Sequence, residues 1–294
     1  MNNNEAISIE SAIKENKKHR LKDRMITGAM YLEIIVVALI VLVPVLWIIG
    51  TSFDNSSSLA TSSIIPKHPT LNNYKKLFKT TQFAVWYGNT LKVAVVNMVC
   101  SVLITTLTAY VFSRFKFKGK KASLMGIMVL QMFPSFMAMT AIYILFLNFG
   151  LLDNLYGLSL TYIAGQIPYN VWLMKGYLGG IPMSLDEAAM LDGASRLQIF
   201  KKIIIPLAFP MITFLAVSTF MAPWMDYVLP RLLISSESKK TLAVGLYDLI
   251  SSDANNQYTQ FAAGAVLVAV PITILYIALQ KHLIYGITAG STKE

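Results

Sequence analysis

Residues 184–206 read SLDEAAMLDGASRLQIFKKIIIP and form a polar, helix-prone segment between two strongly apolar runs. Within it, Glu187-Ala188-Ala189 is followed by three residues, Gly193, nine further residues and then Ile203-x-Ile205-Pro206. A chain that keeps such a segment in water between apolar runs is expected to use it to bind something. We therefore interpret this loop as the part of the sequence that says most about function.

The composition around the loop indicates an integral membrane protein. The chain has 294 residues, 55% of them hydrophobic and only 14% charged, with a mean hydropathy of +0.57. A soluble domain of this size cannot bury so much apolar surface. The net charge of +10 clusters at the ends of apolar runs, so it indicates membrane topology and not a nucleic-acid partner. One cysteine (Cys100) and three separated histidines predict no disulfide, no metal site and no redox chemistry.

Apolar runs long enough to cross a bilayer predict an all-α fold with six transmembrane helices, since each crossing needs about 20 helical residues. Proline and glycine interrupt these runs, which membrane helices tolerate when neighbouring groups satisfy the freed backbone. The expected spans are 25–50, 89–113, 122–147, 156–178, 203–230 and 258–280.

The distribution of lysine and arginine predicts the orientation. Basic residues crowd the segment before the first span and the RFKFKGKK stretch between the second and third spans, at 114–121. With six spans both segments lie on one side, together with the 179–202 loop and the C-terminus. The positive-inside rule makes that side cytoplasmic, so both termini are expected inside. The first span is predicted to be an uncleaved anchor and not a signal peptide.

The loop itself is expected to be a helix, a glycine bend and a second helix. Ser184 followed by Glu187 predicts a capping box, with a short helix over about 185–192 and acidic residues in its first turn. Gly193 is placed to end that helix in the left-handed conformation. A second helical stretch over 194–204 would then lead into the fifth span. An isolated capping box is also what an ordinary connector contains, so the capping box alone does not assign a function.

The complete spacing is more specific, because EAA-x3-G-x9-I-x-L-P resembles the signature of the permease subunits of bacterial ABC importers. Ile205 stands where the pattern has leucine, which keeps an apolar contact. Other segments resemble sugar-importing permeases of the MalG type, the maltose/maltodextrin group. These are PTLNNYKKLF (69–78), NTLKVAVVN (89–97), QMFPSFMAMTAIYILFLNFGLLDN (131–154), APWMDYVLP (222–230) and YGITAGSTKE (285–294).

This resemblance implies a type I ABC importer permease in the cell membrane of a bacterium. The implied partners are a second, MalF-like permease, a MalK-like ATPase homodimer, an extracytoplasmic sugar-binding protein and the lipid bilayer. ATP and Mg²⁺ would bind the ATPase, with no cofactor on this chain. The implied regions are residues 1–84 (tail, first span and first outer loop), 85–280 (the transmembrane domain, with the coupling loop at 182–206) and 281–294 (cytoplasmic tail).

The resemblance also implies roles for single residues. The loop would couple to the ATPase through Ser184, Asp186, Glu187, Ala188, Ala189, Asp192, Gly193 and Pro206, with Glu187 facing a basic residue of the ATPase. The tail would contact the ATPase through Thr288, Ala289 and Gly290. The outer loop 231–257 would lie against the binding protein.

Two polar residues within apolar runs, Gln131 and Asn170, are candidates for lining a transport pathway, although ordinary membrane packing also explains the methionine-rich segment around Gln131. No phosphate-binding G-x-x-x-x-G-K-[ST] motif and no catalytic arrangement is present, so the chain is predicted not to be an enzyme. An ion-coupled secondary transporter would need carboxylates at mid-membrane, where only Glu33 qualifies. Another oligosaccharide or a glycerol-phosphate-like substrate stays open as an alternative to maltodextrin.

Overall fold

The computed structural model describes residues 3–55, 64–132, 134–251 and 256–288, and all regular secondary structure in them is helical. The elements in chain order are α1 (Asn3–Ser52), α2 (Asn72–Thr80), α3 (Phe83–Arg114), α4 (Lys120–Met132), α5 (Ser135–Asn148), α6 (Leu155–Gly179), α7 (Ser184–Leu191), α8 (Arg196–Ile199), the π-helical turn η2 (Phe200–Ile204), α9 (Ile205–Met225), α10 (Val228–Leu233), the 3-10 turn η3 (Glu237–Lys239), α11 (Leu242–Asp248) and α12 (Tyr258–Thr288).

In the described residues, four helical stretches are long and apolar enough to cross a membrane: 22–52, 83–114, 196–225 and 258–281. The expected third span is divided into α4 and α5, which are inclined at 101° to each other, and this pair would make a fifth crossing if it is one broken span. Pro134, the residue before α5, cannot donate a helical hydrogen bond, which accounts for a break here. The count of six apolar spans predicted from the sequence is therefore not reproduced.

The expected fourth span is helix α6, which is not among the strongly apolar helices. Helix α6 packs against α3, α4 and α9, and its polar residues Ser159 and Asn170 are tolerated because they are buried within the chain. Leu158, Val171, Met174 and Leu178 on this helix are fully buried. Helices α3, α6 and α9 form the centre of the molecule. A helix in this position needs less apolar surface than a helix that faces lipid.

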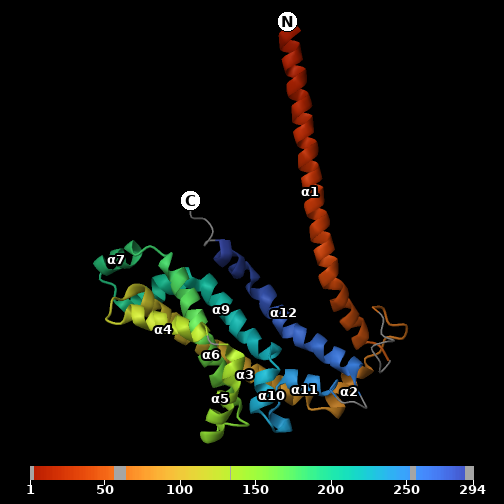
Figure 1. The fold of residues 1–294 in the computed structure, drawn as a ribbon, viewed down its shortest axis with the longest axis vertical. Helices are drawn as coiled ribbons and strands as arrows, with labels where there is room; N and C mark the ends of the chain where they lie inside the picture. Colours follow the sequence, from red (N-terminus) through yellow and green to blue (C-terminus); the bar gives the residue numbers. More distant parts are fainter. Residues whose placement is uncertain (1–2, 56–63, 133, 252–255, 289–294) are drawn as a thin grey trace.

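Helix α1 lies outside this centre and extends far beyond it (Figure 1). Its apolar part, 22–52, buries almost nothing within this chain, and its last turns pack along α12. Asn73 fastens the end of α1, since its amide donates to the carbonyl oxygens of Ser52 (3.0 Å) and Asp54 (2.6 Å). Thr259 of α12 donates to the Asn73 side-chain oxygen at 3.2 Å, so one asparagine joins α1, α2 and α12.

The two ends of the molecule carry different short elements (Figure 1). The start of α1, the end of α12 and helix α7 point to one side, which we call the α7 end. Helices α2, α10 and α11 lie at the opposite side, the α11 end. Beneath α7 lies an apolar cluster of residues from α3, α6, α8, η2 and α9: Ala109, Tyr110, Met174, Leu178, Ile199, Phe200, Ile204, Ala208, Met211 and Leu215.

Candidate functional site

Helix α7 begins one residue earlier than expected, and the predicted capping box at Ser184 is wrong. Met183 precedes the helix in a helical backbone conformation (φ −67°, ψ −25°), and no side chain caps the first turn. A capping side chain needs an extended backbone at its own position, which Ser184 lacks because it is already helical. The capping box lies instead at α8, where Ser195 and Gln198 exchange backbone–side-chain hydrogen bonds of 2.7 and 3.3 Å.

The end of α7 agrees with the sequence. Gly193 has φ +82°, the left-handed conformation predicted for it. The N–H of Gly193 donates to the Met190 carbonyl (3.1 Å) and that of Ala194 to the Ala189 carbonyl (2.9 Å). This pair of bonds is a Schellman motif, which satisfies carbonyls at a helix end. The helix–bend–helix shape expected for the loop is confirmed, with α8 and η2 forming the second helical stretch.

Two neighbouring acidic residues of α7 differ in burial. Asp186 is completely buried, whereas Glu187 is exposed and makes no ion pair within the described part of the chain. Ala188 and Asp192 are exposed, and Ala189 is half-buried against the cluster beneath. The exposed surface is also apolar, with Leu191 exposed to 90%; the other exposed apolar side chains are Met183, Leu185 and Met190.

Asp186 is paired with Arg114, the last residue of α3. The Arg114 Nε atom lies 3.1 Å from Asp186 Oδ2, and the side chains are 4% and 0% exposed. This contact is an ion pair without the linear geometry of a hydrogen bond. The remaining guanidinium nitrogens donate to the carbonyl oxygens of Leu178 and Ile181, each at 3.1 Å. Arg114 thus joins the end of α3, the end of α6 and the start of α7, and the sequence had indicated it only as a topology signal.

Aromatic contacts join α3 to the second half of the loop. The ring of Tyr110 lies 4.7 Å from that of Phe200 in η2, and its hydroxyl donates to the Arg196 carbonyl at 3.4 Å. The Arg196 guanidinium lies 5.5 Å from the ring centre of Phe115. Cation–π and ring contacts of this kind add directional preference to apolar packing. Both halves of the loop are therefore held against the same end of α3.

The π-helical turn η2 leads directly to Pro206. Ile205 donates to the carbonyl of Phe200, five residues earlier, instead of the usual four. Proline at 206 has no N–H to continue a regular ladder, and its ring crowds the carbonyl four residues before it. A π turn just before proline relieves this conflict. Pro206 is exposed and thus acts on the backbone path from the loop into α9.

An open hollow of about 350 Å³ lies where the Gly193 bend meets α8 and η2. Its lining combines both signs of charge with apolar side chains: Asp192, Gly193, Ala194, Gln198, Ile199, Lys202 and Ile203. The hollow begins at Asp192, directly after the last residue of α7.

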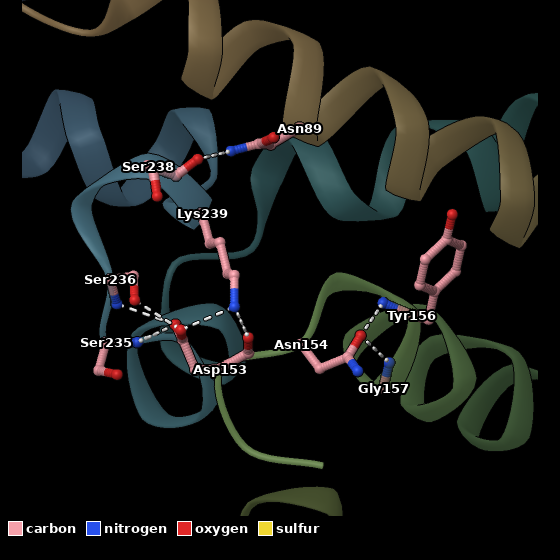
Figure 2. A network of polar contacts seen from close by, with 9 residues as sticks. All are labelled: Asn89, Asp153, Asn154, Tyr156, Gly157, Ser235, Ser236, Ser238 and Lys239. Carbon is pink, nitrogen blue, oxygen red and sulfur yellow. Dashed lines mark hydrogen bonds and ion pairs between the residues drawn. The ribbon is translucent and has the colours of Figure 1, made fainter.

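At the α11 end, Asp153 joins two loops that are about eighty residues apart in sequence (Figure 2). Its Oδ1 accepts from the backbone N–H groups of Ser235 (3.1 Å) and Ser236 (2.9 Å), and its Oδ2 lies 3.0 Å from Lys239 Nζ. Asp153 has φ +54°, an uncommon conformation for a residue with a side chain. The neighbouring Asn154 caps α6 by accepting from the Tyr156 N–H at 2.9 Å (Figure 2).

At the α11 end, hydrogen bonds and neighbouring charges shift the pKa values of Asp153 and Lys240 more than burial does. Partial burial raises the pKa of Asp153, but the bonds from Ser236, Lys239 and Ser235 outweigh it and hold that pKa well below the ordinary value. Burial lowers the pKa of Lys240, yet hydrogen bonds and charge from Asp248 and Glu237 raise it overall. Asn89 of α3 donates to the carbonyls of Ser238 (2.9 Å) and Lys240 (3.0 Å), which joins the loop to α3.

The other predicted site residues are not brought together by the fold. Gln131 is exposed at the end of α4, whereas Asn170 is buried within α6. Thr288 is the last residue of α12, and Ala289 and Gly290 lie outside the described residues. The pathway and tail roles of these residues stay predictions. No cluster of three or more potential metal ligands occurs within the described ranges.

The helical centre and the loop at its α7 end define the class as a membrane-embedded transport permease. Residues 101–288 match the family model described as "Binding-protein-dependent transport system inner membrane component", and the chain belongs to this family. The resemblance to MalG-type permeases of ABC importers is confirmed. The chain is a transport subunit of the cell membrane and not an enzyme.

Relatives of known name align over nearly the whole chain. It is 44% identical over 266 residues to the galactooligosaccharides transport system permease protein GanQ of Bacillus subtilis, covering 90% of this chain and 94% of the relative. It is 41% identical over 263 residues to the maltodextrin permease protein MdxG of the same species, covering 90% and 95%. It is 37% identical over 280 residues to the maltodextrin permease protein MalD of Streptococcus pneumoniae, covering 95% and 99%.

A solved structure confirms the architecture. One chain of a bacterial ABC transporter that imports the acidic polysaccharide alginate superposes with a TM-score of 0.76 at 25% identity, covering 88% of this chain and 97% of that one. A second, at 18% identity and a TM-score of 0.68, is similar in fold, and that alginate transporter was solved with a pentasaccharide-bound periplasmic protein. The chain is therefore a sugar permease of the ABC-importer class.

Proposed function

We propose that this chain is the MalG-type permease subunit of an ATP-driven importer of maltose or maltodextrin, and that α7 is the element that binds its ATPase. The observation that supports this most is the two-sided character of α7. One side is fixed by the Arg114–Asp186 pair, and the other exposes Glu187 with several apolar side chains, including Leu191. An apolar surface with a charge at its edge suits a protein partner.

The proposed topology has six crossings with both termini in the cytoplasm. The start of α1 and the end of α12 lie on the same side as α7, which supports an even number of crossings (Figure 1). The pair α4–α5 would count as one crossing and α6 as another. Arg114, Lys116, Lys118, Lys120 and Lys121 lie at the α7 end, which the positive-inside rule assigns to the cytoplasm. In this proposal 85–280 is the transmembrane domain and 281–294 a cytoplasmic tail.

The proposed partners are a second permease, a pair of ATPase subunits and an extracytoplasmic sugar-binding protein. The family description and the alginate transporter solved with its periplasmic protein support the binding protein. The exposed apolar side of α1, which buries almost nothing in this chain, supports a second permease or lipid around it. Thr288, Ala289 and Gly290 are proposed ATPase contacts, with ATP and Mg²⁺ on the ATPase.

A galacto-oligosaccharide is the second candidate substrate, favoured by the 44% identity to GanQ, whereas MdxG, MalD and several MalG proteins favour maltodextrin. The two substrates are distinguished by the uptake of labelled maltotriose into cells that depend on this permease. Unlabelled malto-oligosaccharide and unlabelled galactotriose are added separately as competitors. Competition only by malto-oligosaccharides supports the first proposal. Uptake of galacto-oligosaccharide alone would reject it in favour of the second.

ATPase binding is tested by Glu187→Lys, with Asp23→Lys as a matched control because Asp23 is an exposed carboxylate on α1. We expect the first variant to lose co-purification of the ATPase and transport, and the control to keep both. Retention of both by Glu187→Lys would disprove the role of α7.

Two further experiments test the rest of the proposal. Uptake in ATP-depleted vesicles driven by a proton gradient would disprove the ABC mechanism. Unchanged coupled ATPase activity after deletion of 285–294 would disprove the role of the tail.

A further inference from the structure

We infer that Arg114 is a positioning residue that makes α7, the end of α3 and the end of α6 move as one body when the ATPase acts on the loop. This inference rests on the proposed function, since it assumes that α7 receives the force. The force would pass from α7 to α3, a path that does not follow the chain. In sequence α7 lies between α6 and α8, whereas Arg114 connects it sideways to α3.

The backbone alone does not hold α7 in place. This helix has eight residues and is joined to its neighbours by two short connecting segments, 180–183 and 192–195, the second containing the left-handed Gly193. A short helix between two such segments could rotate about them if nothing else fixed it. Its deepest side chain is Asp186, which is completely buried.

Arg114, the partner of Asp186, is held in place by two hydrogen bonds besides the ion pair. Arg114 donates to the Leu178 carbonyl in the last turn of α6 and to the Ile181 carbonyl in the connection to α7. The planar guanidinium presents its donors in a rigid fork, so these contacts set the direction in which its Nε meets Asp186. Displacement of α7 would therefore pull on α3 and α6 directly.

Burial explains why this connection would stay intact during a transport cycle. An exposed ion pair exchanges readily with water and salt, whereas separating a buried pair leaves uncompensated charges in a poorly solvated place. Movement of the three elements together avoids that cost. Lysine at 114 could not replace the arrangement, because a single ammonium cannot reproduce the fork geometry.

Two measurements on the purified transporter with its ATPase and binding protein test the inference. Hydrogen exchange of the α7 backbone reports how firmly the helix is held, and the ratio of ATP hydrolysed to sugar imported reports coupling. The variants are Arg114→Met and Asp186→Asn, the second nearly isosteric in case the first does not fold. Lys118→Met is the matched control, because Lys118 is an exposed cation four residues away.

We expect roughly tenfold faster exchange over 184–191 and a roughly tenfold higher ratio of ATP to sugar in the variants, within the usual range of coupling between sites. Lys118→Met should change neither. The double variant Arg114→Met/Asp186→Leu, with apolar residues in place of both charges, should recover the yield of assembled complex but not the coupling.

Transport and ATPase activity that fall together, in proportion to the yield of assembled complex, would overturn the inference, because Arg114 would then serve folding alone. An unchanged ratio in a fully assembled variant would overturn it too. Wild-type transporter without ATP-dependent uptake would instead disprove the proposed function, and the exchange measurement would still report whether Arg114 holds α7.

Discussion

The two ends of this molecule join distant helices by different physical means. At the α7 end the members of the Arg114–Asp186 ion pair are 4% and 0% exposed, and Arg114 also donates to two backbone carbonyls. At the α11 end, Lys239 and Asp153 are 47% and 23% exposed and share their contacts with serine side chains and backbone. The first connection excludes water, and the second is reinforced by several bonds that each contribute little.

This difference indicates different tolerance to change. Removing one member of a buried pair strands a charge, whereas a partly solvated network can replace a lost bond with water. The α7 end is therefore suited to keeping one geometry under load. The α11 end is suited to holding Asp153 and the segment 235–239 together while individual contacts exchange with water.

The difference between the two ends is tested most directly by removing one cation from each end. Arg114→Met should destabilise the protein by about 3–5 kcal/mol, because Asp186 is left buried and unpaired. Lys239→Met should cost about 0–1 kcal/mol, since its pair is half-exposed. Thermal unfolding of both variants in lipid nanodiscs checks this order. Equal losses at the two ends would show that burial does not distinguish the junctions.

A second test adds one carbon atom to the packing at the α11 end. A Cβ on Gly245 of α11 would lie 2.2 Å from the ring of Trp86 in α3, which is itself buried. Gly245→Ala should therefore force these helices apart and cost about 1–3 kcal/mol. Unfolding temperature in nanodiscs measures it, and Gly88→Ala, where nothing lies within 4 Å of the added carbon, is the control. An unaffected unfolding temperature would mean that the contact of α11 with α3 adjusts freely.

A similar change in the loop at the α7 end should act through the backbone instead. Gly193→Ala meets no neighbouring atom within 4 Å but must adopt φ +82°. We expect a cost of about 1 kcal/mol, since alanine disfavours the left-handed region. Gly193→Asn, which tolerates that region better, should recover most of the stability. If alanine and asparagine behaved alike, the Schellman turn would not depend on this conformation.

The smallest expected effect is a pH dependence confined to the α11 end. The pKa of Asp153 is lowered in the folded protein, so its contribution to stability is fully present above the unfolded-state pKa and is lost as pH falls toward the folded value. The difference in unfolding temperature between wild type and Asp153→Asn should therefore be constant near neutrality and shrink below about pH 4. A difference that grew on acidification would contradict the low pKa. The comparison with Asp153→Asn isolates this group from other carboxylates.

Local patterns in the sequence predicted local structure well. The loop helix, the left-handed Gly193 and the second helical stretch follow from residue types at short spacing. The prediction for Ser184 failed because the backbone after Pro182 is already helical, and capping depends on a dihedral angle that sequence spacing does not contain. Ser195 and Gln198 have the same capping pattern three residues apart and could have been found by it.

Contacts between residues far apart in the chain could not be predicted from the sequence. Arg114 stood out only as one of several basic residues near a membrane surface, and Asp186 only as part of the loop motif. Nothing in their spacing of 72 positions distinguishes a buried pair from two solvated charges. The same holds for Asp153 and Ser236, whose contact depends on two loops meeting at the α11 end.

By itself the sequence determined that the chain is an apolar helical membrane protein with a helix–glycine–helix loop, because composition and short-range periodicity set burial in lipid and local backbone conformation. The permease class came from the resemblance of the loop and other segments to a known family. Only the tertiary structure decided that Asp186 points inward to Arg114 while Glu187 points outward. Consecutive residues of a helix differ by about 100° in direction, and which of them meets protein depends on how α3 and α6 pack beside it.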